Sequence, residues 1–370
     1  MRCLVRELVG FATAELHGGI KAREDAQMAR LRLIPDILEP AMSLLQTLLR
    51  KVLPAAGMLT LALHPVPSFA QVTLGVSDWP GWVAWYVAEK EGYFKKYGAD
   101  VKLVWFPDYM TSVNALSAGQ IDANCQALID TLSPAVKKVP AKVILVTDNS
   151  AGNDALMVSN NIKSFAELKG KTIGLEIGSI ENYLAATGLQ KNGLSEKDVN
   201  FVNMSTGDAA AALIAGKLPA AGVWNPWIQR IQTHKAGHPL FTSKSAPGLI
   251  PDVVYARDTA LAAHRKDFVA MTKAWFDAVK FIDANPAKAA AIMAPHVGLK
   301  PEEYALSLAG TKLFGPKLNE EAMSKSASPV SLYTSTAATG AFLVSQKQID
   351  ASPNPASFID SSIVKDAMKP

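Results

Sequence analysis

Residues Val72-Thr73-Leu74-Gly75-Val76 form a short apolar run, and Val101-Lys102-Leu103-Val104-Trp105 form a second one. Between them, aromatic and small side chains from Trp82 to Tyr93 recur at the spacing of a helix face, and Gly98 suits the left-handed end of a helix. Two strands joined by a helix make a βαβ unit, in which the strands are parallel. This stretch therefore predicts an α/β fold with parallel sheets.

Short apolar runs and helical patterns go on alternating at residues 142–146, 172–175 and 199–202. The segment Ala118-Gly119-Gln120-Ile121-Asp122-Ala123 recurs as Ala215-Gly216-Lys217-Leu218-Pro219-Ala220, each copy ending a helix with glycine and opening a strand. We interpret the repeat as two lobes of similar build. Coincidence is the alternative, because such junctions recur in all α/β proteins.

The pattern after Tyr255 is mostly helical, and no Gly/Ser-rich linker divides the lobes. We therefore expect the chain to cross between the lobes through ordered segments, with the C-terminal helices packed on the first lobe or on the hinge. The predicted first lobe is discontinuous, residues 71–155 and 250–370, and the second lobe is residues 156–249.

The composition is that of an ordinary soluble globular protein. Among 370 residues, 37 Lys and Arg stand against 33 Asp and Glu, so the net charge of +4 gives no reason to expect a nucleic-acid partner. The two cysteines, Cys3 and Cys125, are too few for a disulfide framework or a four-ligand zinc site.

The region before residue 71 has the pattern of a secretory signal peptide. The basic pair Arg50-Lys51 precedes the apolar residues 52–63, and His64-Pro65-Val66-Pro67 leads to the small residues Ser68 and Ala70. The apolar run is shorter than the roughly 20 residues that span a bilayer. We predict cleavage after Ala70 and a periplasmic mature chain that does not span the membrane. A buried core segment is the weaker alternative because of the two prolines.

Residues 1–41 precede this signal, whereas a signal peptide begins near the start of a chain. A start at Met42 would give a signal of ordinary length, residues 42–70. We interpret residues 1–41 as a misassigned upstream extension. A cytosolic extension with an uncleaved anchor is the alternative.

Polar residues that follow the apolar runs are the candidates for a binding site, because ligands of open α/β sheets bind beyond the carboxyl ends of the strands. Ser179 has the pattern of a helix N-cap, which also directs free backbone N–H groups at a ligand. Trp79 and Trp224 have Pro or Gly nearby, so we expect them in loops that line a cleft rather than in the core.

Motifs of catalysis are missing from the sequence. It contains no G-x-S-x-G, H-E-x-x-H or P-loop, and no G-x-G-x-x-G after a strand. His234 and His238 have the spacing of a helical metal pair, but Gly237 and Pro239 interrupt that helix. We therefore predict no catalytic residues, no metal site and no cofactor.

Five motifs occur in a characteristic order: Trp79-Pro80-Gly81-Trp82, Glu91-Gly92-Tyr93-Phe94, Leu116-Ser117-Ala118-Gly119-Gln120-Ile121-Asp122-Ala123, Trp224-Asn225-Pro226-Trp227 and Pro247-Gly248-Leu249-Ile250-Pro251-Asp252. From about residue 72 to about residue 314, the chain resembles the nitrate/sulfonate/taurine-type substrate-binding proteins of ABC importers. The resemblance implies a two-lobed type II periplasmic-binding fold, with mostly parallel sheets flanked by helices and a hinge between the lobes. It also implies a monomer that closes on a small solute and presents it to a permease and its ATPase.

The resemblance and the loop positions together give the expected ligand-binding residues. In the first lobe they are Ser77, Asp78, Trp79, Trp82, Gln126, Asp130, Asp148 and Ser150, and in the second lobe Gly178, Ser179, Glu181, Asn182, Trp224 and Asn225. Asn225 stands where many relatives have glutamate, and this difference leaves the ligand open.

The candidate loops contain acids but no Lys or Arg; the acids are Asp78, Asp108, Asp130, Asp148, Asp154, Glu176 and Glu181. Aromatic rings with carboxylates suit an ammonium or guanidinium group. Sulfonate or nitrate could still be held by helix N-termini, and several of the acids could face outward. We expect a small nitrogen- or sulfur-containing solute, with a cation favoured.

Two other functions stay open as alternatives. Enzymes of the thiamine-pyrimidine synthase kind resemble this chain, but they depend on a cysteine-rich stretch and a histidine, and Cys125 is the single cysteine after residue 70. A membrane-tethered sensor lobe would need residues 1–70 to stay attached.

Overall fold

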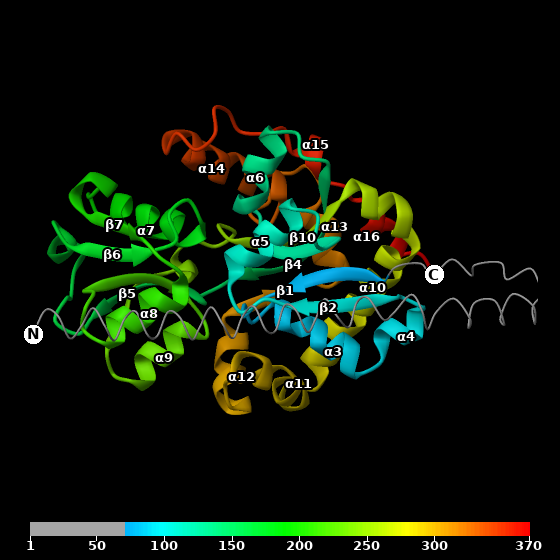
Figure 1. The fold of residues 1–370 in the computed structure, drawn as a ribbon, viewed down its shortest axis with the longest axis horizontal. Helices are drawn as coiled ribbons and strands as arrows, with labels where there is room; N and C mark the ends of the chain where they lie inside the picture. The colour runs from blue at the N-terminus through cyan, green and yellow to red at the C-terminus, as the bar shows by residue number, and fades with distance from the viewer. Residues whose placement is uncertain (1–70) are drawn as a thin grey trace, which may run out of the picture. The chain divides into compact units, whose positions relative to one another are not determined.

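A computed structural model describes residues 71–370. The predictions of an upstream extension, a signal peptide and cleavage after Ala70 lie outside the described residues. In residues 71–370 no helix is both long enough and apolar enough to cross a bilayer. The described chain forms two sheets, each with helices on both faces (Figure 1). The α/β class predicted from the sequence is confirmed.

The first sheet has the strand order β11-β4-β10-β3-β1-β2. A parallel core, in which β1 pairs with β2 and β3, is extended by β10, which runs antiparallel to β3 and β4. We call this sheet and its helices lobe 1. Its strands are β1 (Val72–Val76), β2 (Val101–Trp105), β3 (Ala123–Ala127), β4 (Ala141–Ser150), β10 (Pro251–Arg257) and β11 (Thr311–Leu313).

The second sheet has the strand order β7-β6-β8-β5-β9 and repeats this plan. Here β6 is parallel to β7 and β8, and β5 is antiparallel to β8 and β9. We call it lobe 2, the green part at the left of Figure 1. Its strands are β5 (Asp154–Ser159), β6 (Thr172–Leu175), β7 (Asn200–Asn203), β8 (Ala220–Trp224) and β9 (Gly237–Thr242).

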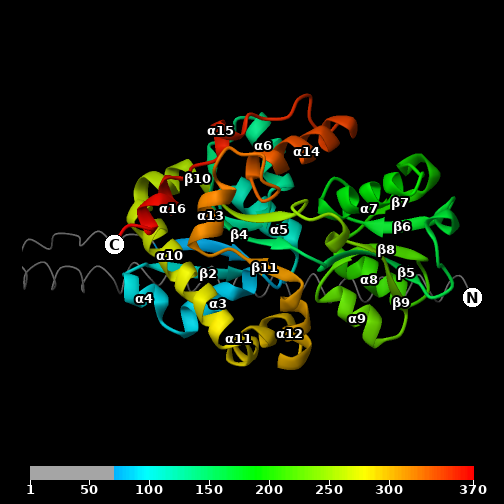
Figure 2. The ribbon, with the colours of Figure 1, turned by 180° about the vertical axis from the view of Figure 1, so that it is seen from behind.

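Helices cover both sheets (Figure 2). Those of lobe 1 are η1 (Trp82–Ala84), α3 (Trp85–Lys90), α4 (Tyr93–Tyr97), α5 (Tyr109–Ser117), α6 (Ile129–Val136), α10 (Asp258–Ala284), α11 (Pro286–Met293), η5 (Ala294–Val297), α12 (Pro301–Ala309), α13 (Pro316–Ala322), α14 (Leu332–Ser345), α15 (Pro355–Phe358) and α16 (Ser362–Ala367). Those of lobe 2 and the return to lobe 1 are η2 (Phe165–Leu168), α7 (Ile180–Lys191), η3 (Glu196–Asp198), α8 (Thr206–Ile214), α9 (Trp227–Thr233) and η4 (Ser243–Ser245).

Glycines end several helices where the sequence predicts. Gly98 closes α4 with φ of 69°, and the repeated glycines Gly119 and Gly216 adopt φ of 73° and 68° after α5 and α8. This left-handed backbone costs glycine little because it has no Cβ. The helix expected between β1 and β2 is nevertheless divided, because Gly92 takes φ of 74° and separates α3 from α4.

Strand β4 is longer than the predicted run at residues 142–146, and it continues to Ser150. Asp148 and Ser150, expected in a loop, are therefore strand residues. The polar end of β4 is buried and pairs with β10, so that Asp148 lies opposite Asp252. In a sequence, polar residues after an apolar run indicate a loop. Here they continue strand β4 toward the crossing between the lobes.

The chain crosses between the lobes twice, from β4 to β5 and from β9 through η4 to β10. Ser243 ties the two crossings together: its Oγ lies 2.7 Å from Ser150 Oγ and accepts a hydrogen bond from the Gly152 N–H at 2.8 Å. The two connecting segments are therefore held side by side at the hinge.

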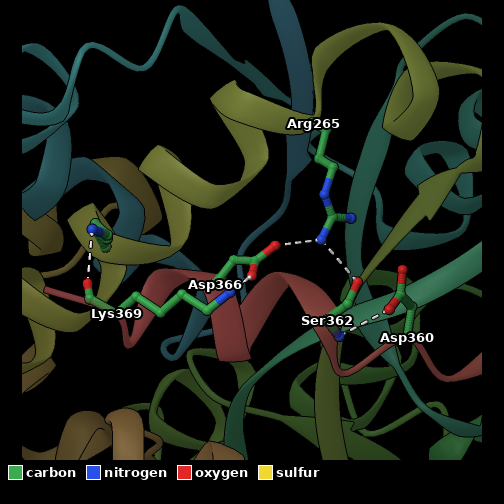
Figure 3. Close-up of polar contacts among 6 residues, drawn as sticks. Arg265, Asp360, Ser362, Asp366 and Lys369 are labelled. Carbon is green, nitrogen blue, oxygen red and sulfur yellow. Dashed lines mark hydrogen bonds and ion pairs between the residues drawn. The ribbon is translucent and has the colours of Figure 1, made fainter.

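The C-terminal helices pack on lobe 1, as expected. Helix α10 contacts α3 and α4, and α16 contacts α10 and β4. Figure 3 shows the polar contacts that join α10 to the C-terminal segment: Arg265 lies 2.5 Å from Asp366 and donates to Ser362 Oγ at 3.1 Å. Asp366 also pairs with Lys369 at 2.6 Å.

Candidate functional site

A small cavity is lined by residues from both lobes. It offers about 20 Å³ to the centre of a water molecule, which is room for about one water. We call it the aromatic box. Its lining residues are Trp79, Trp82, Tyr109, Ala127, Ile250 and Asp252 from lobe 1 and its return crossing, and Asp154, Ile180 and Trp224 from lobe 2.

The walls of the box are aromatic because a tight turn follows β1. The Trp82 N–H donates to the Trp79 carbonyl at 3.1 Å, and both tryptophans line the cavity. The Trp82 ring centroid lies 5.3 Å from that of Tyr109, and Tyr109 meets Trp224 edge-on at 5.8 Å. Four aromatic side chains, each at most 6% exposed, thus line the cavity.

A pair of acidic side chains lies at the lobe 1 side of the box. Asp148 and Asp252 are paired residues of β4 and β10, and both are buried. Trp79 Nε1 donates to Asp148 Oδ1 at 2.8 Å, and the two carboxyls lie within hydrogen-bond reach of each other, so that they can share a proton. Burial raises the pKa of Asp148 to about 6, and burial and the Asp148 charge raise that of Asp252 well above its ordinary value.

A second acidic pair lies at the lobe 2 side. Burial raises the pKa of Asp154 to about 7 and raises that of Glu181 well above its usual range, where the charge of Asp154 adds to the effect. Ser179 Oγ donates to Glu181 Oε2 at 3.0 Å. Hydrogen bonding to Ser150 and to the Glu181 carboxyl opposes the rise for Asp154, so the two acids can share a proton. Each lobe therefore places beside the box a pair of carboxyls whose charged forms are disfavoured.

Asp78 links the two lobes beside the box. Its carboxylate accepts hydrogen bonds from Trp224 Nε1 at 3.1 Å and from Trp227 Nε1 at 2.8 Å. Burial raises its pKa to about 6, and the indole hydrogen bonds oppose that rise. The Arg230 guanidinium, which stacks on Trp227 at 4.4 Å, lowers the pKa slightly.

A larger cavity opens beside the box, with about 400 Å³ of room for water. We call it the vestibule. Its lining residues are Asp108, Met110, Asp130, Glu176, Ile177, Gly178, Ser179, Asn203, Met204, Ser205 and Gln348. Burial raises the pKa of Asp130 and of Glu176 to about 7 each.

The expected ligand-binding residues fall into three groups. Trp79, Trp82 and Trp224 line the aromatic box. Asp78, Asp148 and Glu181 bond to or pair with residues that line it. Asp130, Gly178 and Ser179 line the vestibule instead.

The other five expected residues line neither the box nor the vestibule. Gln126 lies on the opposite face of the first sheet, where it lines a third cavity, because side chains alternate along β3 and Ala127 faces the box. Ser150 belongs to the hinge, and Ser77 is buried without lining the box.

Two asparagines hold backbone rather than face a cavity. Asn182 accepts from the Gly178 N–H and donates to Glu196. Asn225 donates to Asn153 and accepts from the Gln229 N–H. Both side chains are thereby bonded within lobe 2 and its crossing segment, and neither lines the box or the vestibule.

The sequence reasoning missed several lining residues. Tyr109 follows the second apolar run and is the first residue of α5, but it is absent from the expected ligand-binding residues. Asp252 is a strand residue whose partner Asp148 is remote in sequence. The signal for Asp252 was its place at the end of the motif Pro247-Gly248-Leu249-Ile250-Pro251-Asp252, which returns the chain from the hinge.

A sequence profile of the NMT1/THI5-like family matches residues 79–289. The chain belongs to this family. The match runs from the first tryptophan of the box through both lobes and into α10. Sulfonate- and nitrate-binding periplasmic proteins are among the similar proteins and structures, as the sequence motifs predict.

Similar proteins include both binding proteins and an enzyme. A protein of Brucella abortus (strain 2308) named as a binding protein is 29% identical over 248 residues, which cover 64% of this chain and 76% of the relative. The alkanesulfonate-binding protein SsuA of Xanthomonas axonopodis pv. citri has the same fold, with a TM-score of 0.65 at 19% identity over 79% of this chain and 98% of that one. The 4-amino-5-hydroxymethyl-2-methylpyrimidine phosphate synthase of Uromyces fabae is 28% identical over 40% of this chain and 43% of its own.

Proposed function

We propose that this protein is the periplasmic solute-binding component of an ABC importer and that it captures a small nitrogen-containing cation in the aromatic box. The lobes close on the cation, and the closed form delivers it to the permease. The family and the fold support the role of a binding protein, and the charges of the site support the kind of solute.

One observation carries the choice of a cation. The box and its surroundings hold two carboxyl pairs, Asp148 with Asp252 and Asp154 with Glu181, and no lining residue of the box is basic in the described chain. The two carboxyls of each pair have no basic side chain to neutralise them and contact one another. Two buried carboxyls in contact cannot both ionise at low cost, and a group that brings positive charge and N–H donors lets them do so.

An oxyanion meets the opposite situation. Its charge would be repelled by both carboxyl pairs in a medium of low polarity, where charge interactions are strong. The four aromatic rings favour the same sign of ligand, because a ring face attracts cations. The small free space suits an ammonium or guanidinium head rather than a large ring.

The proposal assigns no chemical reaction to the protein. Cys125 is fully buried and forms no disulfide, and burial raises the pKa of its thiol well above the ordinary value, so it stays an unreactive thiol. Delivery of the solute relies on closure of the lobes around the hinge at Ser150 and Ser243.

Thermal denaturation of the purified protein with individual solutes tests the proposal. Ammonium, methylammonium and guanidinium form one set, and nitrate, taurine and methanesulfonate form the other. A ligand at 100 times its Kd adds about 2.7 kcal/mol to stability. We expect stabilisation by members of the cation set, and weaker stabilisation in the variant Asp252→Asn. The exposed Glu302 gives the matched control Glu302→Gln.

Stabilisation by an oxyanion alone would overturn the proposal. It would mean that backbone N–H groups outweigh the carboxyl pairs. Turnover of a pyrimidine substrate would instead indicate the enzyme alternative. Sequencing of the mature N-terminus from the native host tests the periplasmic location, for which we expect Gln71.

A further inference from the structure

The vestibule is a second acidic cavity that the capture of a cation in the box does not use. It is about twenty times roomier than the box, at about 400 Å³ against about 20 Å³. Residues from both lobes line it: Asp108 and Asp130 from lobe 1, and Glu176 with its neighbours from lobe 2. None of its lining residues in the described chain is basic.

Glu176 has an acceptor that the fold leaves unused. The side chain is 6% exposed, and its Oε1 accepts from the Thr206 N–H at 3.2 Å and from Thr206 Oγ1 at 3.4 Å. Its Oε2 is buried and finds no hydrogen-bond partner in residues 71–370. A buried carboxylate oxygen without a donor is costly, and it marks a place where a donor can bind.

The acids of the vestibule act on one another across the lobes. The charges of Asp130 and Asp108 contribute to the raised pKa of Glu176. Asp130 accepts a hydrogen bond from the Tyr109 hydroxyl, and Asp108 caps α5 through the Thr111 N–H at 2.8 Å. Repulsion between like charges would be relieved by one cationic group placed between them.

The rest of the wall mixes apolar side chains with uncharged polar ones. Met110 and Met204 come from opposite lobes, and Ile177 is 50% exposed at the rim. Methionine side chains are flexible and adapt to alkyl groups. The combination of carboxylates with two methionines fits an ammonium group that ends an alkyl chain better than it fits a bare metal ion.

The vestibule and the box share a wall. The Tyr109 ring lines the box while its hydroxyl bonds Asp130 in the vestibule, and Ile180 of the box follows Ser179 of the vestibule. The two cavities are therefore neighbouring but distinct compartments.

We propose that the vestibule is a second cation site, which takes a primary alkylammonium group between Glu176 and Asp130 with its alkyl chain along the two methionines. This inference rests on the proposed function, because it takes the ligand of the box to be a cation as well. The alkylammonium group comes either from the second end of a diamine whose first end fills the box or from a second monoamine.

Isothermal titration calorimetry of the purified full-length protein tests the inference with three probes: methylammonium, n-butylammonium and 1,4-diaminobutane. If a diamine spans both sites, 1,4-diaminobutane binds with one equivalent and more tightly than n-butylammonium. If the sites fill separately, n-butylammonium binds with two equivalents. In both cases we expect Glu176→Gln to weaken the affinity for the ammonium group in the vestibule about tenfold, which corresponds to about 1.4 kcal/mol of binding free energy.

Controls separate this inference from the proposed function. Glu176→Gln keeps the acceptor for Thr206, and circular dichroism checks that it folds. Asp130→Asn is the second variant, and Glu302→Gln is the matched control. Methylammonium binding with one equivalent that neither vestibule variant changes, with no gain for the diamine, would overturn the second site and leave the box intact. Absence of binding by all three cations would overturn both proposals.

Discussion

The Asp78 carboxylate of lobe 1 accepts hydrogen bonds from two indoles of lobe 2, Trp224 at 3.1 Å and Trp227 at 2.8 Å. Both oxygens are used, one for each indole. Since Trp224 also lines the aromatic box, the same contact that joins the lobes positions one wall of the cavity. Closure and the shape of the binding site are therefore linked through one carboxylate.

Replacing Asp78 by asparagine tests this link. The amide nitrogen of Asn cannot accept from an indole, so one of the two hydrogen bonds is lost and the other loses its charge. Hydrogen bonds to charged groups are worth about 1.5–3 kcal/mol, so we expect the affinity for the cation to fall tenfold or more. Small-angle scattering with saturating ligand should show a larger radius of gyration. Asp283→Asn on the exposed side of α10 is the control, and an unchanged affinity of Asp78→Asn would contradict the link.

The stability of the ligand-free protein should fall as pH rises from about 4 to about 8. The folded-state pKa values of Asp78 and Asp148 are about 6, and those of Asp130, Asp154 and Glu176 about 7, all above their unfolded values. The native state thus binds more protons than the unfolded state in this window, so stability is greatest near the unfolded pKa values and is lost as pH rises through the folded ones. For Asp78 alone, the free energy of unfolding should decrease by up to about 3 kcal/mol over this pH range.

Acids with lowered pKa values set the lower limit of the pH range in which the protein is most stable. Asp122 is hydrogen-bonded by Thr73 and Arg257, and Asp277 by Lys96 and Tyr97, and their contribution is lost as pH falls below about 4. The melting temperature, followed by circular dichroism without ligand, should therefore be highest near pH 4 and should fall as pH rises toward 8. A melting temperature that climbs steadily from pH 5 to pH 8 would contradict the prediction.

Ligand affinity should show the opposite trend. A cation binds the ionised carboxyl pairs, so it must displace the protons that the empty site holds near neutral pH. We expect Kd for the cation to decrease as pH rises from about 5.5 to 8. Calorimetry in buffers of different ionisation enthalpy should detect proton release on binding. An oxyanion ligand would reverse the sign of both effects.

Gly81 is expected to tolerate no larger residue. Its φ of −67° is open to any amino acid, but a Cβ there would collide with the fully buried Asp148 carboxylate. Gly81→Ala should destabilise the protein by about 1–3 kcal/mol, as overpacking does. Gly315→Ala is the matched control, since its Cβ would lie 3.9 Å from Val279 Cγ1 and should change stability by less than about 0.5 kcal/mol. Equal urea midpoints for the two variants would show that Asp148 can move aside.

Local patterns in the sequence were sufficient for much of the fold. β1 and β2 have the predicted bounds, because apolar β-branched runs flanked by glycine and polar residues have few alternatives. Gly98, Gly119 and Gly216 end their helices as predicted, since their left-handed backbone depends on the residue itself.

The candidate site was less predictable, because it depends on contacts between distant residues. The sequence does not reveal that Asp252 lies opposite Asp148, since this follows from the pairing of β4 with β10. It places Gln126 near the cleft but cannot show which face of β3 a residue takes. Asn182 and Asn225 have the residue type of a ligand contact, yet each bonds to polar groups of the fold.

The two crossings between the lobes begin and end on neighbouring strands, with Asn149 of β4 paired to Pro251 of β10. Lobe 2 is thus a single uninterrupted insertion that enters and leaves lobe 1 at one place. A short peptide joining Ser150 to Pro251 would make lobe 1 a continuous polypeptide. In evolutionary and engineering terms lobe 2 is an exchangeable module, so the three of nine lining residues that it gives to the aromatic box can be replaced in one piece while the rest of the molecule keeps its connectivity.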